Sequence, residues 1–345
     1  MPIWSHFRAA ATLLTAAPLA FCLAACIQSG AAPPGPPDTG PGSPSGVASD
    51  IRTTVLGTGG QQIFIYEPLG TGRSSAPVIV FLHGYGMINP RVYGAWIKHL
   101  VQRGNTVLYP VYQDSLTHAA DYTPSALAAV QNAYATLRAG GHLLPDDTQL
   151  AILGQSLGGT IGMNLAAAQN TGFPPVRALL AANAGDADTR LPLGPSIQAS
   201  NYDQIPADML FLGVVGADDT FVGSACTISF WNQLTQIPVS NREVIELHSD
   251  YHGFPPLMST HDAAAAFDDA FNTWQSLTAT AWLPSLPNSV NALDYYGFWK
   301  WLDALTDAAF YGPSREYALG DTPEQVFLGT WSDGQPVAPA VRIKP

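Results

Sequence analysis

The sequence predicts an α/β fold, in which a mostly parallel, doubly wound sheet has helices on both faces. From residue 51 onward, short apolar runs alternate with segments of helical character, as expected of such folds. The apolar runs are continuous, which is typical of strands buried on both faces. Composition agrees, because 47% of the 345 residues are hydrophobic and only 12% are charged. A disordered chain would have the opposite balance.

Residues 1–25 are typical of a bacterial lipoprotein signal peptide. His6 and Arg8 give a weakly basic start, and an uncharged run of 17 residues follows at 9–25. A membrane-spanning helix needs about 20 apolar residues, so a secretion signal is favoured. The run ends in Leu-Ala-Ala-Cys at Cys26, which resembles the lipobox that directs lipidation of the cysteine thiol. The alternative is an ordinary cleaved signal peptide with an incidental cysteine.

Residues 26–50 follow as the expected lipid-anchor cysteine and a linker. The stretch 27–50 contains six prolines and five glycines. Such a composition favours a semi-extended tether that buries no core of its own. We therefore expect a protein of the bacterial cell envelope, attached through its lipid anchor and facing the periplasm or the outside.

The elements of the folded part are predicted in order along the chain. Residues 51–58 and 61–68 have β-rich patterns joined by two glycines, which predicts a hairpin. The further strands are expected at 77–82, 106–111, 149–153, 176–182, 208–215 and 242–247. The helices are expected at 89–103, 123–139, 157–169, 225–234 and 262–277. Together these elements define a domain over 51–280.

The sequence Gly-Gln-Ser-Leu-Gly at 154–158 lies between a predicted strand and a predicted helix. In that setting, the pattern G-x-S-x-G indicates a sharp turn that exposes the serine hydroxyl as a nucleophile. Ser156 is therefore the candidate nucleophile. A plain glycine turn is the alternative.

A serine nucleophile needs a base, and a histidine in a later loop is expected to provide it. The candidates are His248, His252 and His261. His248 ends a predicted strand and is interpreted as a core residue, while His261 stands where the 262–277 helix is expected to begin. His252 lies in the loop after the last strand, next to Gly253, and is the predicted base.

The base in turn needs a carboxylate to fix its tautomer. Asp219 follows the predicted strand 208–215 and is the preferred orienter, with Asp218 next to it and Asp186 as further alternatives. Chain order supports the set, because nucleophile, acid and base follow one another as Ser156, Asp219 and His252.

Two backbone N–H groups are expected to bind the oxyanion that forms during acyl transfer. Leu157 opens the helix after the serine, and Tyr85 lies in the turn His-Gly-Tyr-Gly at 83–86. His83 is expected to hold this turn rather than to act as a base.

These motifs resemble the α/β-hydrolase superfamily, over about residues 51–280, and most closely its esterase, dienelactone-hydrolase-like and cutinase-like branch. The resemblance implies an α/β-hydrolase fold and a serine-dependent, two-step acyl transfer to water without a cofactor. We expect a carboxylesterase or lipase-type enzyme acting on a small-molecule or lipid ester. The alternatives are another acyl hydrolase (a peptidase, a thioesterase or a polyester depolymerase) and a catalytically silent surface-binding protein.

Other classes of site have little support. The net charge of −12 leaves little basic surface for nucleic acid. His248 and His252 have the spacing of a zinc helix, but they lie where a strand meets a loop and no glutamate follows the first histidine, so no metal site is expected. Cys226 is interpreted as a small core residue.

Residues 281–345 form an aromatic-rich C-terminal extension, with 11 of the chain's 35 aromatic residues. A helix is expected at 293–310 and a strand at 326–331, followed by a turn. We expect this extension to pack on the hydrolase core. The alternative is that its aromatic side chains cap the substrate pocket or bind a partner.

Overall fold

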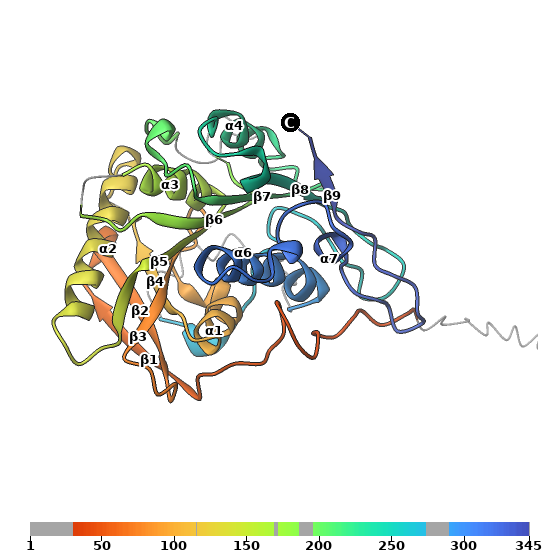
Figure 1. The fold of residues 1–345 in the computed structure, drawn as a ribbon, viewed down its shortest axis with the longest axis horizontal. Helices are drawn as coiled ribbons and strands as arrows, with labels where there is room; N and C mark the ends of the chain where they lie inside the picture. Colours follow the sequence, from red (N-terminus) through yellow and green to blue (C-terminus); the bar gives the residue numbers. More distant parts are fainter. Residues whose placement is uncertain (1–29, 115, 169–171, 186–195, 274–289, 345) are drawn as a thin grey trace, which may run out of the picture.

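A computed structural model describes residues 30–114, 116–168, 172–185, 196–273 and 290–344. In this part of the chain, nine strands form one sheet in the order β1-β2-β4-β3-β5-β6-β7-β8-β9 (Figure 1). The strands are β1 (Asp50–Leu56), β2 (Gln62–Leu69), β3 (Ser75–Leu82), β4 (Thr106–Val111), β5 (Leu144–Gln155), β6 (Val176–Ala182), β7 (Leu210–Gly216), β8 (Arg242–Leu247) and β9 (Val341–Ile343). The central strands β4, β3, β5, β6, β7 and β8 run parallel, whereas β1, β2 and β9 pair antiparallel. The predicted α/β class and mostly parallel sheet are confirmed.

The apolar runs of the sequence form the buried strands. In β3 every residue from Ala76 to Leu82 is buried, and in β7 all seven residues are buried. The first hairpin is also confirmed, with Asp50 paired to Leu69 at its open end. Burial on both faces explains the lack of alternation in these strands, because neither side of the sheet meets water.

Helices cover both faces of the sheet, as predicted. The α-helices are α1 (Gly94–Gln102), α2 (Tyr122–Arg138), α3 (Leu157–Ala166), α4 (Ala225–Gln233), α6 (Lys300–Phe310) and α7 (Pro323–Val326). Helices α1 and α6 contribute to one buried apolar cluster, and α2, α3 and α4 contribute to another. Short 3₁₀ turns lie at Gly59–Gln61, Pro90–Tyr93, Ala119–Asp121, Tyr202–Gln204, Val239–Asn241, Asp269–Phe271 and Arg315–Tyr317.

The C-terminal segment is an integral part of one layer. A π-helix at Asp294–Trp299 leads directly into α6, which agrees with the helix predicted at 293–310. Trp301 and Leu305 are fully buried in the same apolar cluster as α1 and the sheet. The expected packing of this extension on the core is therefore present for residues 290–344.

Two predicted elements of the later chain are wrong. Residues 262–273 form turns and the 3₁₀ turn Asp269–Phe271 instead of a helix, while 274–277 lie outside the described residues. The strand expected at 326–331 is replaced by the end of α7, and the pairing there is a single bridge between Thr330 and Pro336. Helix α6, although far from α1 in the sequence, packs its apolar side chains into the same buried cluster as α1.

The proline-rich segment contacts the domain, so the prediction of a passive tether is wrong for residues 31–48. We call these residues the N-terminal strap. Phe254 N–H donates to Ala31 O at 3.0 Å, Gly42 N–H to Asp303 Oδ2 at 2.8 Å, and Val47 N–H to Gln102 O at 2.8 Å. Prolines keep the chain extended, and the backbone groups of the non-proline residues between them make these hydrogen bonds. The signal peptide and Cys26 lie outside the described residues. No helix within the described ranges has the length and apolar character needed to cross a membrane.

Candidate active site

The register of the parallel strands brings the predicted site loops to one edge of the sheet. Leu82 at the end of β3 pairs with Gly154 in β5, and Gln155 pairs with Ala182 at the end of β6. Gly216 at the end of β7 pairs with Leu247 at the end of β8. The loops that follow these strands therefore start side by side, at the edge where doubly wound sheets bind ligands.

Ser156 occupies a strained turn between β5 and α3. Its φ of 53° and ψ of −123° lie outside the regions that non-glycine residues ordinarily adopt. The flanking glycines are required by close packing. A Cβ at Gly154 would overlap the backbone of Gly158, and one at Gly158 would overlap the backbone of Leu82. This is the sharp strand-to-helix turn predicted from the pattern G-x-S-x-G.

His261 contacts both Ser156 and Asp219. Its Nε2 lies 2.9 Å from Ser156 Oγ, and its Nδ1 lies 2.8 Å from Asp219 Oδ2. An ionised carboxylate can only accept, so Nδ1–H donates to Asp219 and Nε2 is left to accept the serine proton. The three side chains form one continuous hydrogen-bonded chain, in the arrangement of a serine nucleophile, its base and an orienting acid.

The prediction that His252 faces the nucleophile is wrong. His252 Nε2 lies 2.7 Å from Asp333 Oδ2, and both side chains are substantially exposed. The segment after β8 makes a small hairpin, closed by a bridge between Asp250 and Leu257, and His252 is on it. Only after this hairpin does the chain return to the site with His261. The sequence offered His261 as a candidate, but the expected helix at 262–277 argued against it.

His248 is not a core residue either. Its side chain is 40% exposed, and its Nε2 lies 3.3 Å from Glu246 Oε1. Of the three histidines considered, the structure places only His261 within hydrogen-bonding reach of Ser156.

Asp219 is the carboxylate at the site, as preferred from the sequence. Its side chain is fully buried, and Oδ1 accepts the N–H groups of Phe221 at 2.9 Å and Val222 at 3.0 Å. Burial alone would raise the pKa of Asp219, but the hydrogen bond and charge of His261 and these two N–H groups outweigh it and lower the pKa. The carboxylate is therefore held ionised. Asp218 is exposed, and Asp186 lies outside the described residues.

Side chains from the ends of two strands hold the backbone of His261. Asn183, which follows β6, donates from Nδ2 to Thr260 O at 2.9 Å and to His261 O at 3.0 Å. Gln155, at the end of β5, donates to the same His261 O at 3.2 Å. These contacts were not anticipated from the sequence, because they join residues 77 to 106 positions apart.

The loop after β3 runs beside Ser156, as expected for an oxyanion loop. A Cβ built on Gly84 would lie 3.4 Å from Ser156 Cβ. Tyr85 follows in the same turn and is 50% exposed. Leu157 is the first residue of α3, where helix N–H groups have no partner within the helix.

His83 holds the turn rather than acting in it, as predicted. Its ring is fully buried and stacks on Tyr112 with centroids 4.2 Å apart. Burial lowers the pKa of His83 to about 4, with a small opposing effect from its hydrogen bond with Gly84 O. A neutral ring donates from Nδ1 to that carbonyl at 2.7 Å.

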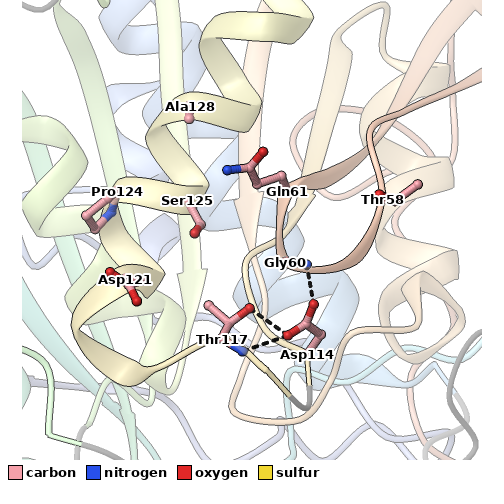
Figure 2. Close-up of a pocket in the computed structure, with 9 residues that line it drawn as sticks. All are labelled: Thr58, Gly60, Gln61, Asp114, Thr117, Asp121, Pro124, Ser125 and Ala128. Atoms are coloured by element: carbon pink, nitrogen blue, oxygen red, sulfur yellow. Dashed lines mark hydrogen bonds between the residues drawn. The ribbon is translucent and has the colours of Figure 1, made fainter.

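A separate polar pocket of about 560 Å³ opens near the start of α2 (Figure 2). Its lining includes Asp114, Asp121 and Ser125, and it contains neither Ser156 nor a histidine. The Asp114 carboxylate accepts from Gly60 N and from Thr117, so it fixes its own loop. The pocket therefore has no nucleophile–base pair. Among the described residues, no group of three or more His, Cys, Asp or Glu side chains could hold a metal ion.

Cys226 is partly buried against the apolar cluster of α2, α3 and α4, with its Sγ 3.9 Å from Thr160 Oγ1. This agrees with its interpretation as a packing residue.

A search of protein-family models found no match to this chain, and neither did a search of curated proteins.

Proposed function

We propose that this protein is a serine hydrolase that cleaves carboxylic esters through an acyl-enzyme, and that it belongs to the α/β-hydrolase superfamily. The observation that carries the proposal is the hydrogen-bonded chain from Ser156 Oγ through His261 to buried Asp219. Its setting adds support, because the serine sits on a strained strand-to-helix turn and the loop after β3 runs beside it. His261 replaces His252 as the proposed base.

In the proposed acylation step, Ser156 Oγ attacks the ester carbonyl carbon while its proton passes to His261 Nε2. The carbonyl oxygen becomes an oxyanion, for which the N–H groups of Tyr85 and Leu157 are the proposed donors. The ionised Asp219 stabilises the imidazolium that forms. The tetrahedral intermediate then collapses, and the alcohol leaves with the proton from His261. Ser156 is left as an acyl ester.

Deacylation repeats these roles with water. His261 Nε2 takes a proton from water, and the resulting hydroxide attacks the acyl carbon. The same two N–H groups bind the second oxyanion. Breakdown of this intermediate releases the carboxylic acid, and Ser156 regains its proton from His261. The cycle uses protein groups and water alone.

The surroundings of the site favour an ester with an apolar part. The Phe221 ring lies 5.5 Å from the His261 ring and is 45% exposed, so it forms an apolar wall beside the base. Tyr85 adds a second exposed aromatic side chain from the oxyanion loop. Thioesters, peptides and polyesters remain as other acyl substrates of the same machinery.

The test is labelling with a fluorophosphonate probe, together with a panel of esters of increasing acyl length, a thioester and a peptide. Wild type should label and hydrolyse esters best, and Ser156→Ala should do neither. Ser125→Ala is a matched control, because Ser125 is likewise a serine at the N-terminal end of a helix but lines the separate pocket (Figure 2). An unlabelled wild type without hydrolysis would favour the silent binding protein. Equal labelling of Ser156→Ala would place the nucleophile elsewhere.

We further propose that Cys26 carries a lipid that attaches the protein to the bacterial envelope, on the sequence pattern at 9–26. Cys26→Ser should then move the protein from the membrane fraction to the soluble fraction with its ester hydrolysis intact. Retention of the Cys26→Ser protein in the membrane would contradict the lipid.

A further inference from the structure

Gln155 lies immediately before the nucleophile and is buried, with 4% of its surface exposed. Its side chain contacts two other parts of the site. Tyr93 OH lies 2.8 Å from Gln155 Oε1, and His261 O lies 3.2 Å from Gln155 Nε2. Gly84 N–H in turn donates to Tyr93 OH at 3.2 Å. Gln155 thus lies between the oxyanion loop and the backbone of His261.

The direction of every hydrogen bond in this chain is fixed by chemistry. A main-chain carbonyl can only accept, so the amide NH₂ of Gln155 must face His261 O. Its Oε1 therefore faces Tyr93, which donates its hydroxyl proton and accepts from Gly84 N–H. Burial raises the pKa of Tyr93, so the phenol keeps the proton that it donates. The chain runs in one direction, from Gly84 through Tyr93 and Gln155 to His261.

Close packing adds to this constraint. A Cβ on Gly84 would overlap Gln155 Oε1, so the peptide before Tyr85 lies directly against the Gln155 amide. The Gly84–Tyr85 peptide carries one of the two proposed oxyanion donors. Its position is therefore set by the same side chain that holds His261 O.

We propose that Gln155 and Tyr93 are positioning residues that hold the oxyanion loop and the His261 backbone in register around Ser156. The inference rests on the proposed function, and it assigns to these two residues a role in turnover beyond stability. Misplacing catalytic groups by about 1 Å can reduce turnover by roughly 10²-fold. Because neither residue is proposed to touch the ester, their loss should lower kcat and leave KM nearly unchanged.

The experiment compares the full-length wild type with Gln155→Met, Gln155→Glu and Tyr93→Phe in ester hydrolysis. Gln155→Met removes both hydrogen bonds, while Gln155→Glu keeps an acceptor for Tyr93 and loses the donor to His261 O. Tyr93→Phe removes only the hydroxyl group, so this variant still tests the inference if the Gln155 variants fail to fold. We expect kcat to fall by about 10²-fold in each, with KM nearly unchanged. The double variant Tyr93→Phe/Gln155→Met should have a kcat little lower than that of the less active single variant, because both residues act in one chain of hydrogen bonds.

Gln236→Met is the matched control. Gln236 also donates from a glutamine amide to loop carbonyls, at 2.8 Å to Tyr202 O and 3.2 Å to Ile205 O, away from the site. The Gln236→Met variant should be less thermally stable than wild type but have the same kcat. Wild-type kcat in folded Gln155 and Tyr93 variants would overturn the inference, and so would a fall in kcat that only follows the loss of folded protein. The proposed function fails separately, if wild type neither labels nor hydrolyses esters.

Discussion

Two histidines after β8 each contact an aspartate, and the two pairs differ in their surroundings and in the ring nitrogen that faces the carboxylate, Nε2 in His252 and Nδ1 in His261. His252 and Asp333 approach to 2.7 Å, and His261 and Asp219 approach to 2.8 Å. In the first pair, His252 lies on the exposed hairpin and Asp333 lies in a turn near the C-terminus, and their side chains are 39% and 48% exposed. The second has a histidine 13% exposed and a fully buried carboxylate. Only the second contacts Ser156, the proposed nucleophile, at 2.9 Å.

The comparison teaches that a histidine–carboxylate hydrogen bond alone does not single out a candidate catalytic pair, because its surroundings differ as well. A base needs a fixed position, and the backbone of His261 is held by both Gln155 and Asn183. An orienting acid needs to stay ionised out of water, and His261 together with two backbone N–H groups does this for Asp219. Water can replace either member of the His252 pair, so loss of this contact should change the free energy of unfolding little.

The strongest test of this comparison is removal of each histidine. His261→Ala should reduce kcat by about 10⁴-fold or more, because it removes the proposed proton acceptor of Ser156. His252→Ala should stay near wild type. The measurement is ester hydrolysis by purified, folded variants. A crippled His252→Ala beside an active His261→Ala would reverse the assignment.

The second test removes the carboxylates. Asp219→Asn should reduce kcat by roughly 10⁴-fold, because an amide can stabilise the wrong tautomer of His261. Asp333→Asn and Asp218→Asn should change kcat little. If Asp219→Asn were active and Asp218→Asn were not, the acid would be the neighbouring residue despite its exposure.

The third test loosens the exposed hairpin without touching the site. Asp250 Oδ2 accepts from Trp331 Nε1 at 3.0 Å and from Ala338 N–H at 2.8 Å. Asp250→Ala would leave these donors without their acceptor, and the free energy of unfolding should fall by about 1–3 kcal/mol. Unfolding by denaturant measures this free energy. Under native conditions, kcat should be unchanged. A large loss of kcat would mean that the hairpin and the site are coupled.

The smallest expected effect concerns stability at low pH. The folded pKa of Asp219 is lowered, so its contribution to stability is present above the unfolded pKa, about 3.9, and is lost as pH falls through the folded value. The difference in unfolding free energy between wild type and Asp219→Asn should therefore shrink below about pH 4. Asp333→Asn should show a weaker pH effect that salt suppresses, because that carboxylate is exposed. If the difference in unfolding free energy between wild type and Asp219→Asn stayed unchanged down to pH 2, this would contradict the lowered pKa.

Local pattern predicted much of the fold and part of the site. Strands β3, β4, β6 and β7 were predicted because each is largely an apolar run buried on both faces, and in β5 the buried run is its second half. Ser156 was predicted because two glycines at fixed spacing allow a close turn, and Asp219 because it follows a strand at the edge where doubly wound sheets bind ligands. These signals are local, and the structure has these elements and residues at the predicted positions in the chain.

The sequence by itself determined the mostly parallel sheet and the sharp turn at Ser156, and it favoured Asp219 over Asp218 and Asp186 as the proposed acid. The tertiary structure alone decided that His261 reaches the serine, since a hairpin at 250–257 carries His252 away and no helix begins at 262. It also decided that the N-terminal strap packs on the domain and that α6 lies in the same layer as α1. The physical reason is the same in each case. These contacts join residues far apart in the chain, and their stability depends on partners that no local pattern reveals.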